Sequence, residues 1–374
     1  MRCLAFDLGR VVFDFDYTIA LNKIKEKVSV PIEKIIEDLF YNDFAKDFEK
    51  GLASSAQFYT KFKTAYAAHL TYEEFVDIWS DIFYPKEEII KLIERLKVIY
   101  PVYLISNINE LHFQHLLVRY PHVFALFDGL VLSFQVKSVK PERKIYEVLR
   151  EVSGENYENI IYIDDRHDLI VAAEKLNLHC LEFGDYNQLI ADLASLGVSV
   201  LQESEISILT FLKDKISSHK NPCIVGLGNI LQSDDGVGAH IARGIKDKVH
   251  LQVFDVGLGL ENYLGKLAQN VYDFFLVIDA GEFQAEEHFA LFSPNQISDI
   301  SLYFTHDSSL KLAIQYLQKE KIFDILIFTI KPRIHSFGEQ LSEPVARAAE
   351  MIKKFFVRNF SQSLKKNSES TDGT

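Results

Sequence analysis

Cysteine is scarce in this chain: three residues among 374, far apart at Cys3, Cys180 and Cys223. Each lies in an apolar run with the pattern of a β-strand, so we expect buried, reduced thiols. This excludes a disulfide framework and a cysteine-based metal site. Reduced cysteines are typical of the cytoplasm, which is the compartment we expect.

Positive charge is also in short supply, because 40 Lys and Arg residues face 53 Asp and Glu residues, for a net charge of −13. No basic stripe is available to neutralise phosphates, which argues against nucleic acid and against an anionic membrane surface as partners. Apolar runs long enough to span a membrane are missing, and the acids within residues 1–20 are unlike a signal peptide.

What the chain does contain is an alternation of apolar runs with amphipathic stretches, in a composition that is 48% hydrophobic and 25% charged. This alternation predicts an α/β protein with parallel sheets. The strand-like runs form two series: Cys3–Phe6, Val102–Ile105, Leu130–Phe134, Ile160–Ile163 and Cys180–Phe183, then Cys223–Val225, Leu251–Asp255, Phe274–Ile278, His288–Phe292 and Ile325–Ile330.

The length and the two series of strands predict two domains. We expect an N-terminal domain at residues 1–200, in which the region 17–95 is a helical insertion because it is amphipathic and poor in strand signals. A linker is expected at 201–220 and a second α/β domain at 221–360. The polar residues 361–374 are expected to be a disordered tail.

Polar residues follow successive strands of the first series. Asp7 follows the first strand, Ser106 the second, and the adjacent Asp164 and Asp165 a later one, while Lys140 lies between them in the chain. Carboxyl ends of parallel strands meet at one edge of a sheet, where ligands bind. The set predicts phosphoryl transfer through an aspartyl-phosphate, in which Asp7 attacks, the hydroxyl and the ammonium stabilise the transferring oxygens, and the acids hold Mg²⁺.

These motifs carry a resemblance to a known family. Residues 1–190 resemble the haloacid-dehalogenase superfamily, especially its small sugar-phosphate phosphatases, in the segments Phe-Asp7-Leu-Gly-Arg-Val-Val-Phe, Leu-Ile-Ser106-Asn107, Ser138-Val-Lys140-Pro-Glu and Ile-Asp164-Asp165-Arg-His-Asp168. The resemblance implies a Rossmann-like parallel sheet with a helical cap and a small phosphorylated metabolite as substrate. It implies Asp7, Ser106 and Lys140 as catalytic residues, Asp7, Asp164 and Asp165 as magnesium ligands, and Asn107 as a substrate-binding residue.

The nucleophile motif departs from the family pattern at one position. Most phosphatases of the superfamily carry a general acid two residues after the nucleophile, where this chain has Gly9, so the leaving-group proton must come from elsewhere. A competing frame, Asp14-Phe-Asp16-Tyr-Thr18, would make Asp14 the nucleophile but leave the strand Cys3–Phe6 unexplained. A degenerate domain that has lost turnover is the remaining alternative.

The second series opens on a glycine-rich loop, Gly226-Leu-Gly-Asn-Ile-Leu-Gln-Ser-Asp-Asp235-Gly-Val-Gly238. A dinucleotide site is disfavoured, because Leu231 stands where a third glycine is needed and two acids would repel a pyrophosphate. Asp279 follows a later strand, and His306 lies further on. Two carboxylates and an imidazole suit a divalent transition metal such as nickel or zinc, with positions left open for substrate.

Residues 221–357 resemble the nickel–iron hydrogenase maturation endopeptidases, in that loop and in Asp255-Val-Gly257-Leu-Gly, Ile-Asp279-Ala-Gly and Thr-His306-Asp-Ser-Ser-Leu. The resemblance implies a compact α/β sandwich that removes a C-terminal extension from the precursor of the hydrogenase large subunit after nickel insertion. It implies that Asp235, Asp279 and His306 contact nickel brought by the substrate, with Asp255 and Gly257 in substrate binding. The segment Lys331-Pro-Arg-Ile-His-Ser departs from the family's Pro-Glu pair.

Together the two resemblances predict a bifunctional cytoplasmic hydrolase, in which a maturation protease is fused to a magnesium-dependent phosphatase. A non-enzymatic module that checks nickel or docks a partner, with a degenerate phosphatase as scaffold, is the alternative. A phosphatase with a decayed second half is the weakest reading, because the glycine-rich loop is intact.

Overall fold

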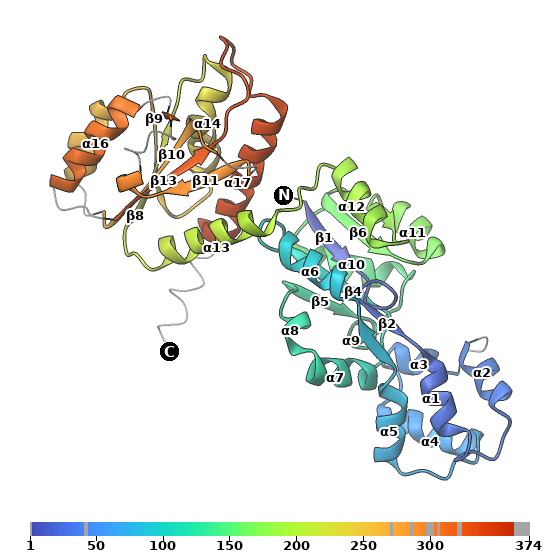
Figure 1. Ribbon diagram of the computed structural model, residues 1–374. Helices are drawn as coiled ribbons and strands as arrows, with labels where there is room; N and C mark the ends of the chain where they lie inside the picture. The colour runs from blue at the N-terminus through green and yellow to red at the C-terminus, as the bar shows by residue number, and fades with distance from the viewer. Residues whose placement is uncertain are drawn as a thin grey trace. The chain divides into compact units, whose positions relative to one another are not determined.

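The computed structural model describes residues 2–40, 44–269, 272–284, 287–296, 303–304, 307–319 and 324–362. The chain divides into two compact units, Met1–Val200 and Leu201–Thr374. Each unit is built on its own sheet flanked by helices, so the predicted α/β class with two domains is confirmed (Figure 1). No helix in the described ranges combines the length and apolar character that crossing a membrane requires.

The first unit is built on a five-stranded sheet of order β5-β4-β1-β6-β7, in which every pairing is parallel. Its central strand β1 is completely buried, as an apolar run enclosed between two neighbours should be. The strands are β1 (Cys3–Phe6), β4 (Val102–Ser106), β5 (Gly129–Leu132), β6 (Ile160–Asp164) and β7 (His179–Glu182).

Amphipathic helices flank this sheet (Figure 1). They are α6 (Glu87–Leu96), α7 (Glu110–Arg119), α8 (Pro121–Phe124), α9 (Ser133–Val136), α10 (Arg143–Ser153), α11 (His167–Glu174) and α12 (Tyr186–Ser195), with the 3₁₀ turn η1 (Tyr157–Asn159). The strand predicted at Leu130–Phe134 is too long, because the chain turns into α9 at Ser133. That hydroxyl accepts a hydrogen bond from the amide of Ile108 at 3.0 Å, which ties the turn to the neighbouring loop.

Most of the predicted insertion forms a helical cap with an aromatic core of its own, in which Phe58, Phe62, Phe75 and Trp79 pack together. The predicted range 17–95 is too long, because its last helix, α6, flanks the sheet instead (Figure 1). Its helices are α1 (Tyr17–Ile24), α2 (Ile32–Phe40), α3 (Lys46–Glu49), α4 (Ser55–Ala65) and α5 (Tyr72–Ser80). A two-stranded antiparallel sheet of β2 (Phe13–Phe15) and β3 (Phe83–Pro85), which is not predicted from the sequence, joins cap and sheet.

The second unit is built on a sheet of order β11-β13-β10-β8-β9, with β12 added to β10. Its inner strands pair in parallel, whereas β11 and β12 pair antiparallel. The strands are β8 (Pro222–Leu227), β9 (Gln252–Gly257), β10 (Phe274–Glu282), β11 (Phe289–Phe292), β12 (Tyr303–Phe304) and β13 (Ile325–Ile330).

The helices of this unit are α13 (Glu203–Ser217), α14 (Val237–Ile245), α15 (Leu264–Gln269), α16 (Asp307–Lys319) and α17 (Glu343–Phe360), with the 3₁₀ turns η2 (Ser233–Gly236), η3 (Leu260–Tyr263) and η4 (Pro294–Gln296). The segment 201–220, expected as a linker, instead holds α13, because Leu209, Leu212 and Ile216 recur at helical spacing and are buried. Of the predicted tail, residues 363–374 lie outside the described part of the chain.

Candidate functional site

Asp7, Ser106 and Asp164 lie together at one edge of the first sheet. β1 pairs with both β4 and β6, and Phe6 stands opposite Leu104 on one side and Ile163 on the other. Asp7 continues this ladder, since its amide donates to the carbonyl of Ile163 at 2.9 Å. The polar residues that end these neighbouring strands therefore meet at the carboxyl edge of the sheet, where the sequence predicts a site.

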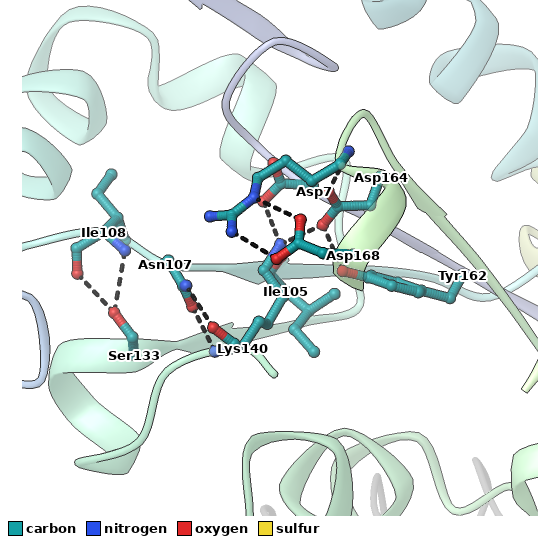
Figure 2. Close-up of polar contacts among 10 residues, drawn as sticks. Asp7, Ile105, Asn107, Ile108, Ser133, Lys140, Tyr162, Asp164 and Asp168 are labelled. Carbon is teal, nitrogen blue, oxygen red and sulfur yellow. Dashed lines mark hydrogen bonds and ion pairs between the residues drawn. The ribbon is translucent and has the colours of Figure 1, made fainter. Parts of the chain in front are cut away.

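Lys140 connects the acids of this edge (Figure 2). Its buried ammonium donates to Asp7 Oδ1 at 2.7 Å and to Asp164 Oδ2 at 2.6 Å. The backbone of Lys140 is held in turn by Asn107, whose Oδ1 accepts from the Lys140 amide at 2.7 Å and whose Nδ2 donates to its carbonyl at 3.0 Å. Asn107, predicted to bind substrate, therefore positions the lysine.

The pKa values of Lys140 and Asp7 reflect their contact. Burial alone would lower the pKa of the lysine, but the adjacent Asp7 and Asp164 carboxylates outweigh burial and raise it. Burial raises the pKa of Asp7 and Asp164 adds to the rise, while Lys140 opposes both. The ammonium is therefore permanently charged, and it is the group that favours an ionised Asp7.

Asp7, Asp164 and Asp165 can offer oxygen atoms that all lie within 4.8 Å of one another. Such hard oxygen donors in a compact group are what Mg²⁺ prefers, so the residues fit the ion that the sequence predicts. Burial, followed by the nearby Asp164, raises the pKa of Asp165, as expected where carboxylates crowd without enough positive charge. Asp164 is oriented by the Tyr162 hydroxyl and by the Arg166 amide, which donates to it at 2.9 Å.

The acids open onto a cavity of about 390 Å³ between the sheet edge and the cap. This volume suits a small metabolite. The cavity is lined by polar and aromatic side chains of both the sheet domain and the cap. The sheet domain contributes Asp7, Ser106, Asn109, His112, Lys140, Asp165 and Arg166, and the cap contributes Tyr17, Glu49 and Trp79. The sequence analysis does not assign Glu49, Arg166 or His112, although Arg166 directly follows the paired acids and His112 lies six residues after Ser106.

Asp14, the competing nucleophile, lies elsewhere. It belongs to β2, is partly exposed, and pairs with Arg10. It shares no metal-like cluster with other acids among the described residues. Asp168 also stays outside the cluster, because both of its oxygens accept from Arg166, at 3.1 and 2.7 Å (Figure 2). The geometry thus favours the frame in which Asp7 ends the central strand.

His112 is a buried, neutral residue of the cavity wall. Its Nδ1 accepts from Asn109 Nδ2 at 3.0 Å, which leaves Nε2–H to donate to the Trp79 carbonyl at 3.1 Å. The ring also stacks on Trp79, with centroids 5.8 Å apart. Burial lowers the pKa of His112 to about 3, opposed by the Trp79 carbonyl and assisted by His115.

We expect this histidine to make the first unit less stable in acid. Between its ordinary pKa of 6.5 and the folded value of about 3, the unfolded chain binds a proton that the folded chain does not. The free energy of unfolding should therefore fall by roughly 2 kcal/mol more from pH 6.5 to pH 5 in the wild type than in His112→Gln. Urea titrations followed by fluorescence of Trp79, the sole tryptophan, measure this difference. Parallel pH profiles of the two proteins would contradict it.

The glycine-rich loop of the second unit connects β8 to α14 through η2. Its glycines permit a close approach of helix and sheet: a Cβ on Gly238 would lie 2.1 Å from the carbonyl oxygen of Ile278, and one on Gly226 2.3 Å from that of Gly238. The loop is thereby fixed against β8 and β10. The glycines serve packing here, which agrees with the argument against a dinucleotide site.

Two of the predicted nickel-contacting residues are buried, one in the turn η2 after β8 and the other within the neighbouring parallel strand β10. Asp235 follows β8 within η2, and its Oδ2 accepts from the Asn229 amide at 2.9 Å. Asp279 lies in β10, and its Oδ1 accepts from the Ala280 amide at 2.9 Å. His306, the third, lies outside the described residues. Asp235, Asp279 and His306 therefore remain a predicted set, of which the acids stand in a suitably buried position.

Asp234, next to Asp235, anchors the segment 331–336, in which the sequence departs from the family's Pro-Glu pair. It accepts from the amides of Arg333 and Ile334 at 2.8 Å each, and from the amide and hydroxyl of Ser342 at 2.7 and 2.8 Å. Burial alone would raise the pKa of Asp234, but these hydrogen bonds lower it below its usual value. The two acids of the loop thus have different tasks, since Asp234 anchors the segment 333–342.

Removing this anchor should loosen that segment. We expect Asp234→Ala to destabilise the second unit by about 3 kcal/mol, because buried amides lose a charged acceptor, whereas Ser342→Ala costs about 1 kcal/mol. Hydrogen-exchange mass spectrometry of the segment 333–342 measures the loosening directly. Equal exchange in Asp234→Ala and the wild type would show that the carboxylate is dispensable.

Asp255 and Gly257, predicted to bind substrate, organise the end of β9. Asp255 pairs with Arg243 of α14 and accepts from the Gly257 amide at 3.2 Å. Gly257 has a φ of 55°, a left-handed conformation that favours glycine, and its carbonyl accepts from the Gly228 amide at 3.1 Å. Their part in substrate binding stays a prediction.

Comparison with known proteins gives a result for each unit. Residues 1–177 match the model of the haloacid dehalogenase-like hydrolase family, so the N-terminal resemblance is confirmed. Similar solved structures include an enzyme of that family from Bacteroides thetaiotaomicron, 22% identical, covering 51% of this chain and 98% of that chain, with a TM-score of 0.47. A predicted HAD-like family hydrolase from Porphyromonas gingivalis is 24% identical, covers 52% and 98%, and has a TM-score of 0.46.

For the second unit, the similar structures include the [NiFe] hydrogenase maturation protease HycI from Thermococcus kodakarensis KOD1. It is 27% identical, covers 39% of this chain and 98% of that chain, and has a TM-score of 0.35. The maturation protease HybD from Thermococcus kodakarensis is 22% identical, covers 36% and 95%, and has a TM-score of 0.32.

Proposed function

We propose that the haloacid dehalogenase-like hydrolase domain of residues 1–177 is a magnesium-dependent phosphatase of small phosphorylated metabolites, with Asp7 as its nucleophile. The observation that carries this proposal is the contact of Lys140 with both Asp7 and Asp164, at 2.7 and 2.6 Å, on the floor of a cavity of about 390 Å³. A nucleophilic carboxylate, a fixed cation and grouped acids in one closed space are what phosphoryl transfer through an aspartyl-phosphate requires.

The residues divide the work as follows. The Asp7 carboxylate attacks phosphorus, and Lys140 orients it and favours its ionised form. The Ser106 hydroxyl and the Lys140 ammonium bind the phosphoryl oxygens as charge moves onto them. Asp7, Asp164 and Asp165 would hold Mg²⁺, which when bound neutralises charge on the phosphoryl group. The cap wall with Tyr17, Glu49 and Trp79 covers the reacting group and limits the access of bulk water.

A panel of sugar phosphates, with p-nitrophenyl phosphate as a general substrate, tests the proposal. The full chain should release inorganic phosphate from at least one of them in the presence of Mg²⁺. Release should stop after chelation with EDTA and return when Mg²⁺ is restored. A chain that binds Mg²⁺ but releases phosphate from no member of the panel would support the alternative of a scaffold without turnover.

For the second unit we propose a maturation endopeptidase that trims the precursor of a nickel–iron hydrogenase large subunit after nickel insertion. Support comes from the loop motif ending in Gly238 and from the burial of Asp235 in η2 and of Asp279 in β10, the strand that pairs with β8. With His306 they would contact nickel carried by the substrate, and a metal-polarised carbonyl with an activated water is the simplest route to peptide hydrolysis. Because the cysteines are free thiols, we place both activities in the cytoplasm.

The test uses full-length chain with nickel-loaded and nickel-free precursor, and reads C-terminal trimming by mass spectrometry. Trimming of the loaded precursor alone supports the protease and its dependence on nickel. Nickel-dependent binding without trimming would instead favour the non-enzymatic module that checks nickel and docks the precursor.

A further inference from the structure

The proposed phosphatase lacks an acid at the usual place, Gly9, and the structure shows that a side chain there would be crowded. A Cβ added to Gly9 would lie 3.0 Å from Cε1 of Phe15, a tight contact. Phe15 belongs to the short strand β2 and is itself covered by Arg10, whose guanidinium carbon lies 4.3 Å from the ring centroid. Since this space is filled, a proton for the leaving group must come from another element.

Most titratable groups of the cavity wall are already engaged. Asp7 is the nucleophile, Asp165 belongs to the proposed metal group, and Lys140 donates to two carboxylates. His112 uses both ring nitrogens in hydrogen bonds, and its pKa of about 3 keeps it neutral. None of these groups can donate a proton to the leaving group and still fulfil the role described.

The other titratable side chains that line the cavity among the described residues are Arg10, Arg166, Tyr17 and Glu49. Arg10 pairs with Asp14, and the hydrogen bond to Asp168 raises the pKa of the Arg166 guanidinium further, so neither serves as an acid. Burial, followed by the charge of Glu49, raises the pKa of Tyr17 above its usual value, which makes it a poor acid. Among the described residues of the wall, Glu49 is therefore the remaining group that can give and take a proton.

Glu49 is held in the wall through its backbone, and no side chain of the described residues forms a hydrogen bond with its carboxyl. It ends α3 of the cap, and its carbonyl accepts from the Ser133 hydroxyl of the sheet domain at 2.7 Å. Lys137 donates to the carbonyl of Gly51 just beyond it. Gly51 has a φ of 64°, and a Cβ there would meet the Phe134 carbonyl oxygen at 2.1 Å. These contacts fix the end of α3 against the loop that begins at α9.

We propose that Glu49 is the general acid and base of the phosphatase, in place of the acid that Gly9 replaces. The inference rests on the proposed phosphatase function. Burial raises the pKa of the Glu49 carboxyl, with a smaller opposing effect from Arg166, so the group is poised to hold a proton closer to neutral pH than an exposed glutamate.

In the first step the Asp7 carboxylate forms a bond to phosphorus while the bond from phosphorus to the ester oxygen breaks. The leaving oxygen keeps the electron pair and takes the proton of Glu49, which releases an alcohol. In the second step a water forms the bond to phosphorus as Glu49 takes its proton. The bond to Asp7 breaks, which returns its carboxylate and frees inorganic phosphate, with Glu49 protonated again.

The experiment compares leaving groups in the full-length wild type, in Glu49→Gln and in the matched control Asp47→Asn, an exposed change in the same helix. A sugar alkoxide needs a proton to leave, whereas p-nitrophenolate does not. Glu49→Gln should lower kcat/KM for the fastest sugar phosphate of the panel by about 10²- to 10⁴-fold. With p-nitrophenyl phosphate it should give a nitrophenolate burst at the wild-type rate, followed by slow turnover. Asp47→Asn should match the wild type with both substrates.

Two results would overturn the role of Glu49 while leaving the phosphatase intact. The first is an unchanged kcat/KM for the sugar phosphate in Glu49→Gln. The second is a nitrophenolate burst slowed as much as the sugar phosphate reaction, which would indicate a general loss of structure. A wild type that releases phosphate from neither substrate would instead refute the phosphatase, and the role of Glu49 with it.

Discussion

Asp7→Asn should lower phosphate release by on the order of 10⁶-fold, the scale observed when a covalent nucleophile is removed from a catalytic group that acts as a unit. The amide cannot form the acyl phosphate, although it keeps the shape of the carboxyl. The fold should survive, because Lys140 retains its contact with Asp164 at 2.6 Å. Initial rates on the best phosphomonoester, with unfolding curves as a check, measure the effect.

The matched control for this change is Asp14→Asn. Asp14 of β2 pairs with Arg10 and stands apart from the acids of the sheet edge, so its replacement should leave phosphate release at the wild-type level. If Asp14→Asn abolished release and Asp7→Asn did not, the competing frame would be correct and the sheet edge would not be the site.

Asp279→Asn should reduce trimming of the nickel-loaded precursor by more than about 10²-fold, because losing a direct metal contact costs more than losing an outer partner. Asp279 is fully buried within β10, and its Oδ1 accepts from the Ala280 amide, which an asparagine oxygen can also do. The change therefore removes charge with little change in packing. Quantitative mass spectrometry of precursor and product follows the reaction.

The two units provide reciprocal controls for these variants. Asp279→Asn should release phosphate like the wild type, and Asp7→Asn should trim the precursor like the wild type, since each acid lies in its own compact unit. Trimming at the wild-type rate by Asp279→Asn would refute the proposed nickel contact. Loss of both activities in either variant would point to a folding defect.

The sequence predicts the sheet edge of the first unit well, because local patterns determine it. An apolar run that is buried on both faces, such as Cys3–Phe6, has few alternatives to a central parallel strand. Once the strand is fixed, the polar residue after it must lie at the carboxyl edge. Asp7, Ser106 and Asp164 follow from this reasoning, and their meeting needs only the order of strands in the sheet.

The cap side of the cavity could not be predicted in this way. Glu49 reaches the cavity because its carbonyl binds Ser133, which is 84 residues away in the chain. The short strands β2 and β3 pair across a similar separation, and their few residues give no period of their own. Contacts of this kind depend on how the cap packs, which no local pattern encodes.

The glycine-rich loop shows a limit of another kind. Asp234 and Asp235 are adjacent acids in one motif, and the sequence gives no reason to treat them differently. The backbone turn η2 directs them to different partners, so that Asp234 receives the amides of the segment 333–342 while Asp235 receives that of Asn229. Position along a turn, rather than residue type, separates the anchor from the candidate metal contact.

Trapping the phosphorylated intermediate tests the central claim most directly. Acid quenching during turnover, followed by borohydride reduction, converts an acyl phosphate into homoserine. Trypsin then releases the peptide Cys3–Arg10, in which Asp7 is the sole acidic side chain, while Asp14 falls in the next peptide. We predict homoserine at position 7, dependent on substrate and Mg²⁺. Homoserine at position 14, or none during measurable turnover, would contradict the assignment of Asp7 as the nucleophile.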